Sequence, residues 1–283
     1  MHLERGEIGR LPCLAAGSGR PLLYLSGLMP QAGVDGLGPV AWACIGPLAR
    51  HRRVLFVNRR RGLPPGTTMA GLAAEHAEAI AAAFGGPVDV LGVSTGGSLA
   101  QQLAADHPQA VRRLVLVSSG CRLGPEARAL QRRVVGRLRR GADRRALAVL
   151  AASVVPPALQ VPAALAGWLA APAVARAFGG FDDLAATLEA EDGFDLAACP
   201  RPIRAPTLIV AGDRDADYPR AVLEETARLI PGSRLLLRPR RGHATALFGP
   251  AFTRAVVGFL DEPDAGGAQA RSTSQTSTAG SPA

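Results

Sequence analysis

The residues best suited to chemistry surround Ser94, which stands between Gly92 and Gly96 in the order G-x-S-x-G. A serine hydroxyl can attack a carbonyl carbon when a sharp strand-to-helix turn presents it, and the residues two before and two after it must then be very small. The apolar run 88–93 predicts a buried parallel strand, and 96–106 predicts a helix after it. Because the chain contains 33 glycines, the pattern alone is weak, and an ordinary helix N-cap is the alternative interpretation of Ser94.

A nucleophilic serine needs a base to take its proton and an acid to orient that base. The run 205–212 predicts another buried strand, and three aspartates follow it. These are Asp213, Asp215 and Asp217. A further strand is expected at 233–238, with His243 in the loop beyond it. Since the carboxyl ends of parallel strands meet at one edge of a sheet, we expect Ser94, one aspartate and His243 to converge there.

Four stretches carry a resemblance to a known family. They are PLLYLSGL near residue 21, GVSTGG around Ser94, APTLIVAGDRDADYP around Asp215 and RGHATALF around His243. On these stretches the chain resembles the α/β-hydrolase-fold serine hydrolases of the esterase or acyl hydrolase type, which place Ser, Asp and His in this order along the chain. The resemblance implies an α/β fold with a mostly parallel central sheet, flanking helices and an inserted helical cap.

The resemblance also assigns roles to individual residues. The family acid usually lies three residues after the glycine that closes its strand, which favours Asp215 and leaves Asp213 and Asp217 as alternatives. An oxyanion hole is implied at the backbone N–H groups of Thr95 and Leu28. The chain departs from the family here, because Ser26-Gly27 stands where the family usually has His-Gly.

The expected reaction is acyl transfer in two steps. His243 would deprotonate Ser94, the serine would form an acyl-enzyme, and water activated by His243 would release the acid. This chemistry requires no metal and no organic cofactor, and the expected substrate is a small, apolar carboxylic ester. The same triad serves thioesterases, lactonases, carbon–carbon bond hydrolases and cofactor-free haloperoxidases, so these remain alternatives. A noncatalytic relative that binds a ligand or a protein partner is the alternative of another class.

Composition excludes several other functions. All 32 basic residues are arginine, so the chain lacks the lysine that a P-loop, a pyridoxal Schiff base or a Ser-Lys dyad requires. The net charge of +9 suggests nucleic acid, but aromatic residues make up only 4% and no recognition module is evident, so we expect no nucleic-acid partner. An acidic protein partner remains an alternative that no motif supports. The sequence identifies neither the natural substrate nor the oligomeric state.

The chain divides into a hydrolase core at 1–122 and 196–263, with a helical cap at 123–195 between the two parts. The last residues, 264–283, are small and polar and predict a disordered tail. We expect the cap to consist of short helices, interrupted by Pro156-Pro157, Pro162, Pro172 and Gly179-Gly180. Trp168 and Phe178 are its candidates for lining a substrate pocket, and packing in the cap's own small core is the alternative for them.

Targeting signals are not evident. Gly, Pro and Arg interrupt each apolar run before the roughly 18 residues that a membrane span needs, and Glu4 and Glu7 do not fit a signal peptide. We therefore expect a cytoplasmic protein without a membrane partner. The four cysteines match no metal spacing and are expected to be thiols.

Overall fold

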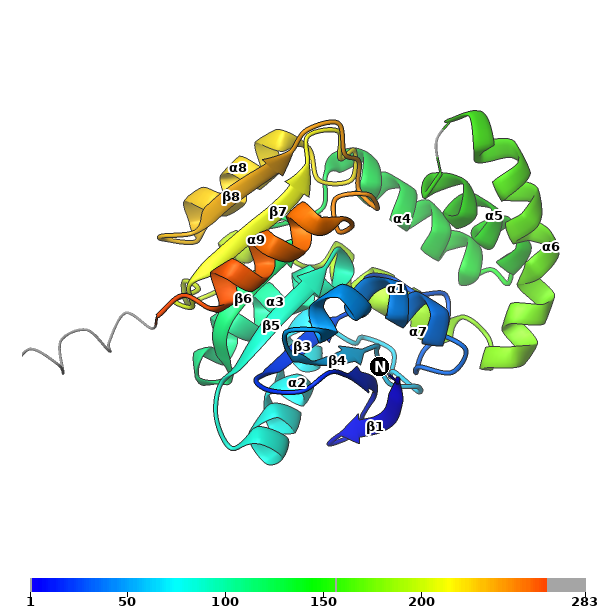
Figure 1. Cartoon of the computed structure of the whole chain (residues 1–283). Helices are drawn as coiled ribbons and strands as arrows, with labels where there is room; N and C mark the ends of the chain where they lie inside the picture. Colours follow the sequence, from blue (N-terminus) through cyan, green and yellow to red (C-terminus); the bar gives the residue numbers. More distant parts are fainter. Residues whose placement is uncertain (1, 156, 264–283) are drawn as a thin grey trace, which may run out of the picture.

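A mixed sheet of eight strands forms the centre of the computed structural model, which describes residues 2–155 and 157–263 (Figure 1). The strands are β1 (Glu4–Ile8), β2 (Leu11–Ala16), β3 (Pro21–Leu25), β4 (Arg53–Val57), β5 (Val88–Val93), β6 (Val111–Val117), β7 (Thr207–Gly212) and β8 (Arg234–Arg238). Their order in the sheet is β1-β2-β4-β3-β5-β6-β7-β8. β2 pairs antiparallel with β1 and β4, and the other pairs are parallel. The expected tail at 264–283 lies outside the described residues.

Successive side chains of the central strands point to opposite faces of the sheet, and both faces are buried. On β3, Leu23 and Leu25 belong to one apolar cluster, whereas Leu22 and Tyr24 belong to the other. The first cluster is covered by α2 (Met69–Phe84), α3 (Thr95–Asp106) and α8 (Arg220–Leu229). The second is covered by α1 (Gly38–Ala49) and α9 (Pro250–Leu260). This is the layered α/β-hydrolase fold, with the carboxyl ends of the parallel strands at one edge.

Four further helices lie between β6 and β7 and stand beside that edge (Figure 1). They are α4 (Pro125–Leu138), α5 (Asp143–Ser153), α6 (Gln160–Phe178) and α7 (Asp182–Asp192). A small apolar core of their own holds them together, and Val134, Leu147, Leu184 and Leu188 are among its members. We call these four helices the cap.

The cap helix α6 is longer than the proline pattern predicts. Pro162 and Pro172 both lie inside α6, so the expectation that they interrupt the helix is wrong. Pro162 falls in the first helical turn, where its missing N–H removes no helical hydrogen bond. Pro172 lies inside the helix, which continues until Gly179 ends it in a left-handed conformation with φ of 80°.

The length of α6 also bears on the membrane expectation. Within the described residues, α6 is the one helix long and apolar enough to cross a bilayer by length and composition alone, contrary to the expectation that no stretch qualifies. Only 6% of the apolar stretch of α6 is buried. The helix is therefore an exposed apolar element of the cap.

Candidate active site

Ser94 lies in the tight turn between β5 and α3 with backbone angles of φ 51° and ψ −120°. Such a positive φ is uncommon for a residue with a side chain, and it marks a strained turn. A Cβ atom on Gly92 would lie 2.4 Å from the Gly96 carbonyl oxygen, and one on Gly96 would lie 2.3 Å from that of Leu25. Both positions therefore require glycine for reasons of space, and the turn brings the Ser94 hydroxyl to the sheet edge.

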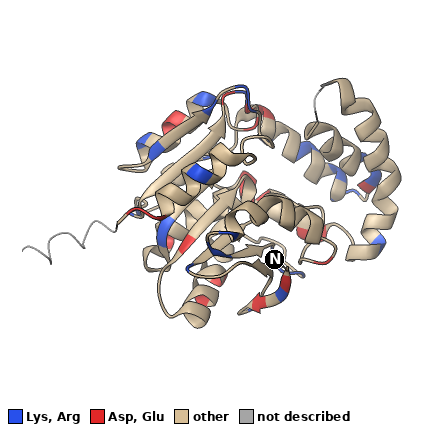
Figure 2. Ribbon diagram, viewed as in Figure 1, with Lys and Arg blue, Asp and Glu red and all other residues tan. Residues whose placement is uncertain are grey.

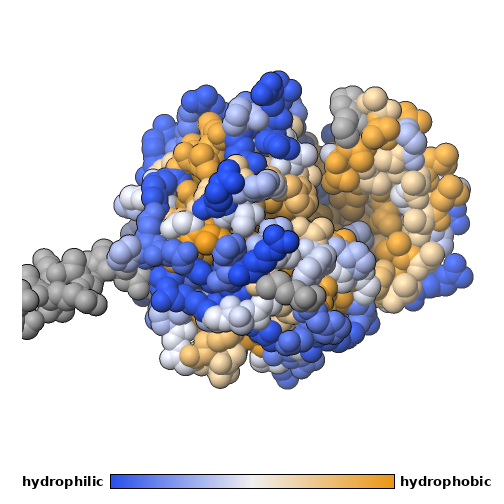
Figure 3. All heavy atoms as spheres, viewed as in Figure 1, coloured by the Kyte–Doolittle hydropathy of each residue, from blue (hydrophilic) through white to orange (hydrophobic). Residues whose placement is uncertain are grey.

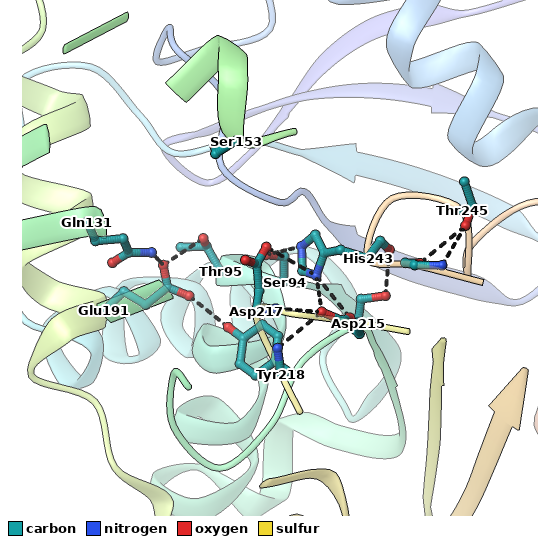
Figure 4. A network of polar contacts seen from close by, with 12 residues as sticks. Ser94, Thr95, Gln131, Ser153, Glu191, Asp215, Asp217, Tyr218, His243 and Thr245 are labelled. Atoms are coloured by element: carbon teal, nitrogen blue, oxygen red, sulfur yellow. Dashed lines mark hydrogen bonds and ion pairs between the residues drawn. The ribbon is translucent and has the colours of Figure 1, made fainter. Parts of the chain in front are cut away.

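The structure brings Ser94, His243 and Asp215 into one hydrogen-bonded chain (Figure 4). Nε2 of His243 lies 3.0 Å from Oγ of Ser94, and Nδ1 lies 3.1 and 3.0 Å from the two carboxylate oxygens of Asp215. Oδ2 of Asp217 is farther from Nδ1, at 3.6 Å, and Asp213 is exposed. In the neutral tautomer of His243 that suits these hydrogen bonds, the Nδ1–H donates to Asp215 and Nε2 accepts from the Ser94 hydroxyl.

Neighbouring groups hold the acid and the imidazole in place. Oδ1 of Asp215 accepts hydrogen bonds from the backbone N–H groups of Asp217, at 3.0 Å, and Tyr218, at 3.1 Å. The hydroxyl of Ser118 donates to the backbone carbonyl of His243 at 2.8 Å. The ring of Tyr218 stacks against the imidazole, with 5.9 Å between ring centroids. These contacts hold the Asp215 carboxylate and the His243 imidazole in one relative orientation.

The charges around His243 favour its protonated form. Burial by itself would lower the pKa of His243, whereas the hydrogen bond and the negative charge of Asp215 raise it. The charges of Asp217 and Glu191 act in the same direction, so the pKa of the imidazole lies above its ordinary value. A positive charge on this ring is therefore stabilised by the carboxylates around it.

The two candidate oxyanion donors both lie beside Ser94. Thr95 follows it directly at the N-terminus of α3, and the loop carrying Leu28 is close, since a Cβ on Gly27 would lie 3.5 Å from that of Ser94. Thr95 and Leu28 line the same cavity. Within the described chain, neither backbone N–H donates to another protein group, so both are available to a developing oxyanion.

A cavity of about 550 Å³ lies between the cap and the sheet edge and includes Ser94 and His243 in its wall. Most of its lining is apolar. Its aliphatic and aromatic members include Leu28, Met29, Leu123, Leu130, Leu147, Leu150, Val154, Val174, Leu184, Leu247 and Phe248. The Ser94 hydroxyl thus lies at the wall of an apolar pocket.

The two predicted pocket residues are elsewhere, and this prediction is wrong. Neither Trp168 nor Phe178 is among the residues that line the cavity. The indole of Trp168 is partly exposed and lies under the Arg144 guanidinium, 4.3 Å from ring centroid to carbon. On α6 the residues that line the cavity are Gly167, Ala170 and Val174. Gly167 lies where the helix packs closely on α5, because a Cβ there would be 2.6 Å from the Leu147 carbonyl oxygen.

Asp215, Asp217 and His243 each offer one ligand atom, and these atoms lie within 4.8 Å of one another. That spacing would suit a metal ion. Both imidazole nitrogens are, however, already used, with Nδ1 directed at Asp215 and Nε2 at Ser94. The cluster therefore fits the hydrogen-bonded chain better than a metal site.

Sequence reasoning missed Glu191, a completely buried carboxyl group on α7 (Figure 4). Four side chains donate hydrogen bonds to it. They are Thr95 at 2.8 Å, Ser98 at 3.2 Å, Gln131 at 2.8 Å and Tyr218 at 3.1 Å. Burial raises the pKa of Glu191, and these hydrogen bonds offset part of that effect. The carboxyl group thus joins two cap helices to the turn that carries Ser94, and no local pattern in the sequence marks it.

Comparison with known proteins identifies the fold and its relatives. The model of the "Alpha/beta hydrolase family" matches residues 23–256. A pimeloyl-(acyl-carrier protein) methyl ester esterase of Neisseria meningitidis is 34% identical over 202 residues, which cover 66% of this chain and 62% of that esterase. The chain therefore matches less than two thirds of that relative's length.

Solved structures agree on the fold. A hydrolase from Pseudomonas aeruginosa is 29% identical with a TM-score of 0.69, and the match covers 92% of this chain and 98% of that one. An enol-lactonase from Burkholderia xenovorans superposes with a TM-score of 0.66 at 22% identity, covering 92% of this chain and all (100%) of that one. At that identity the likeness concerns the fold alone.

Replacing Glu191 by alanine should destabilise the protein strongly. The change leaves three hydroxyl groups and an amide buried without their acceptor, which we expect to lower the free energy of unfolding by about 2–4 kcal/mol. Chemical denaturation measures the loss. Glu189→Ala, on the same helix, is the control, because the exposed ion pair of Glu189 with Arg139 should contribute less than about 1 kcal/mol. Equal losses in the two variants would contradict the role given to Glu191.

Proposed function

Because the chain belongs to the alpha/beta hydrolase family, we propose that it is a cofactor-free serine hydrolase that cleaves carboxylic esters carrying an apolar acyl or alkyl group. The observation that carries the proposal is the contact of 3.0 Å between Nε2 of His243 and Oγ of Ser94, with Asp215 on the other ring nitrogen. A hydroxyl, an imidazole and a carboxylate in this order form the constellation that activates a serine nucleophile.

The proposed mechanism has two halves. In the first, His243 takes the proton of the Ser94 hydroxyl while its oxygen attacks the ester carbonyl, and the N–H groups of Thr95 and Leu28 donate to the oxyanion. The imidazolium then protonates the departing alcohol, which leaves an acyl group on Ser94. In the second half, His243 deprotonates a water molecule that attacks this acyl-enzyme. The acid departs and the proton returns to the serine.

The cavity supports the choice of substrate class. Of the described residues that line it, none is an arginine, so a substrate carboxylate would find no guanidinium there. The aliphatic side chains from the cap and the core suit a neutral, apolar group, whose burial is worth roughly 0.8 kcal/mol per methylene. A volume of about 550 Å³ is ample for a chain of several carbons.

A fluorophosphonate probe tests the nucleophile. We expect covalent labelling of Ser94, and we expect Ser94→Ala to lose both the labelling and the turnover of p-nitrophenyl esters, by roughly 10⁴-fold or more. Mass spectrometry of the labelled peptide and an absorbance assay give the two readouts. A series of acyl chain lengths, run on esters and on thioesters, then defines the preferred bond and group.

Ser153 provides the matched control for this experiment. It lines the same cavity, but its hydroxyl donates to the backbone carbonyl of Leu150 at 2.9 Å. Ser153→Ala should keep labelling and turnover near those of the unmodified protein. Persistent labelling of the Ser94→Ala variant, or turnover that survives it, would refute the assignment, and no labelling of the unmodified protein would favour the noncatalytic alternative.

The pH dependence of turnover tests the base. His243 must be neutral to accept the proton of Ser94, and its pKa is raised, so kcat/KM should increase with pH and reach half its maximum above about 6.5. Asp217→Asn removes one of the charges that raise this pKa, so its midpoint should move to lower pH. The midpoint is measured from kcat/KM with a neutral ester across the pH range.

Asp213→Asn is the control for that shift. Asp213 follows the same strand but is exposed and is not among the groups that shift the pKa of His243, so its midpoint should stay in place. A midpoint that moves equally in both variants would point to a general change in charge. A midpoint that moves in neither would exclude Asp217 as an influence on the base.

A further inference from the structure

The outer face of α6 is an apolar surface exposed to solvent. Val161, Leu165, Trp168 and Leu169 are exposed to 81%, 58%, 40% and 60% of their full area. Their spacing of i, i+4, i+7 and i+8 places them on one side of the helix. We call these four residues the α6 stripe. In Figure 3 the orange surface of the cap lies where Figure 1 draws α5 and α6.

The rest of the chain has little comparable surface. The described residues include ten exposed large apolar side chains, and six of them lie between Val154 and Leu169, in the turn before α6 and on the helix itself. Single exposed apolar residues are ordinary, whereas a contiguous group of this kind marks an interaction site. The stripe therefore needs a partner that the described chain does not provide.

The opposite face of α6 fixes the stripe in its outward orientation. A Cβ on Gly167 would lie 2.6 Å from the backbone carbonyl oxygen of Leu147, so α5 and α6 pack with their backbones close together. Ala171 is buried, and Ala170 and Val174 line the cavity. Turning the stripe inward would break this packing and force large side chains where only small ones fit. The helix thus presents one side to the cavity and the other to the surroundings.

Two exposed arginines border the stripe. The guanidinium of Arg144 lies over the Trp168 ring, 4.3 Å from its centroid, and Arg176 lies seven residues beyond Leu169 on the same side of the helix. Neither forms an ion pair with any part of the chain that the structure describes. Over the longer stretch 125–178 the sequence has nine arginines against two carboxylates, and Figure 2 shows several blue segments on the cap.

This charge distribution disfavours a second copy of the chain as the partner of the α6 stripe. A second copy meeting the first through its α6 stripe would bring Arg144 and Arg176 near the same arginines, with few carboxylates to offset them. An anionic lipid surface offers what both features need, because apolar side chains enter its acyl region while arginines meet the headgroups. A tryptophan with a cation over its ring also suits the boundary between the two regions.

We propose that the α6 stripe seats the cap on an anionic lipid surface, with Arg144 and Arg176 at the level of the headgroups. The helix lies on the surface and does not cross it, because its inner side remains packed in the cap. Val154, which follows α5 six residues before α6 begins, is exposed and also lines the cavity, so it offers an apolar ester dissolved in the lipid a route to Ser94. The seating is independent of catalysis, and only this route rests on the proposed function.

Vesicle sedimentation with the full chain tests the seating. We expect the protein to sediment with vesicles of phosphatidylcholine and phosphatidylglycerol, and far less with phosphatidylcholine alone. The double variant L165Q/L169Q should have a partition coefficient into the mixed vesicles that is lower by about tenfold or more, because it removes apolar area from the contact. R144Q/R176Q should reduce the preference for the anionic lipid.

V40Q/W42Q is the matched control, because Val40 and Trp42 are exposed apolar side chains on α1, which belongs to the core. It should bind vesicles like the unmodified protein. All variants should turn over a short soluble ester at the unmodified rate, since none of the substituted residues lines the cavity. If neither the unmodified protein nor any variant turns over the ester, the proposed function is contradicted. Vesicle sedimentation still tests the lipid contact in that case, because it does not depend on turnover.

Three results would overturn the seating. The first is an unmodified protein that does not sediment with either vesicle. The second is equal sedimentation of L165Q/L169Q and the unmodified protein. The third is a dimer in light scattering that L165Q/L169Q converts to a monomer without any vesicle binding, which would assign the stripe to a second copy of the chain.

Discussion

The close approach of two backbone segments at Gly96 is the constraint on which the site depends. The carbonyl oxygens of Leu25 and Ser26 leave no room for a side chain there, so the N-terminus of α3 lies directly against the end of β3. Ser94, two residues before this contact, has a positive φ, and its hydroxyl lies at the sheet edge. The loop with Leu28 begins at the same place, so the contact that presents the hydroxyl also brings a second backbone N–H next to it.

Glu191 extends this constraint from the core into the cap. Its carboxyl group accepts hydrogen bonds from Thr95 on α3, from Gln131 on α4 and from Tyr218, whose backbone N–H binds Asp215. A shift of the cap would therefore disturb both the turn after Ser94 and the support of the carboxylate. Buried polar networks of this kind hold one arrangement because each unsatisfied group is costly. The cap and the hydrogen-bonded chain at the sheet edge are parts of one network.

The error about Trp168 and Phe178 has a physical cause. Large apolar residues on a helix are usually expected on its buried side, and that expectation placed them in the pocket. α6 packs closely on α5 at Gly167, and Ala170 and Val174 line the cavity, whereas the large side chains of the α6 stripe lie outside. Residue spacing can identify which side chains share a face of a helix, but it does not tell which face the neighbouring helix covers.

The sequence by itself determined the features that depend on neighbours along the chain. It identified the strands before Ser94, Asp215 and His243, the need for small residues at the turn, and the edge at which these side chains meet, because strand patterns and steric limits are local. Tertiary structure decided the rest. Only folding set Asp215 at 3.0 Å from the imidazole with Asp217 farther away, and only folding brought Glu191 to Thr95, 96 residues earlier in the chain. Such contacts depend on how whole elements pack, and no short stretch of residues encodes them.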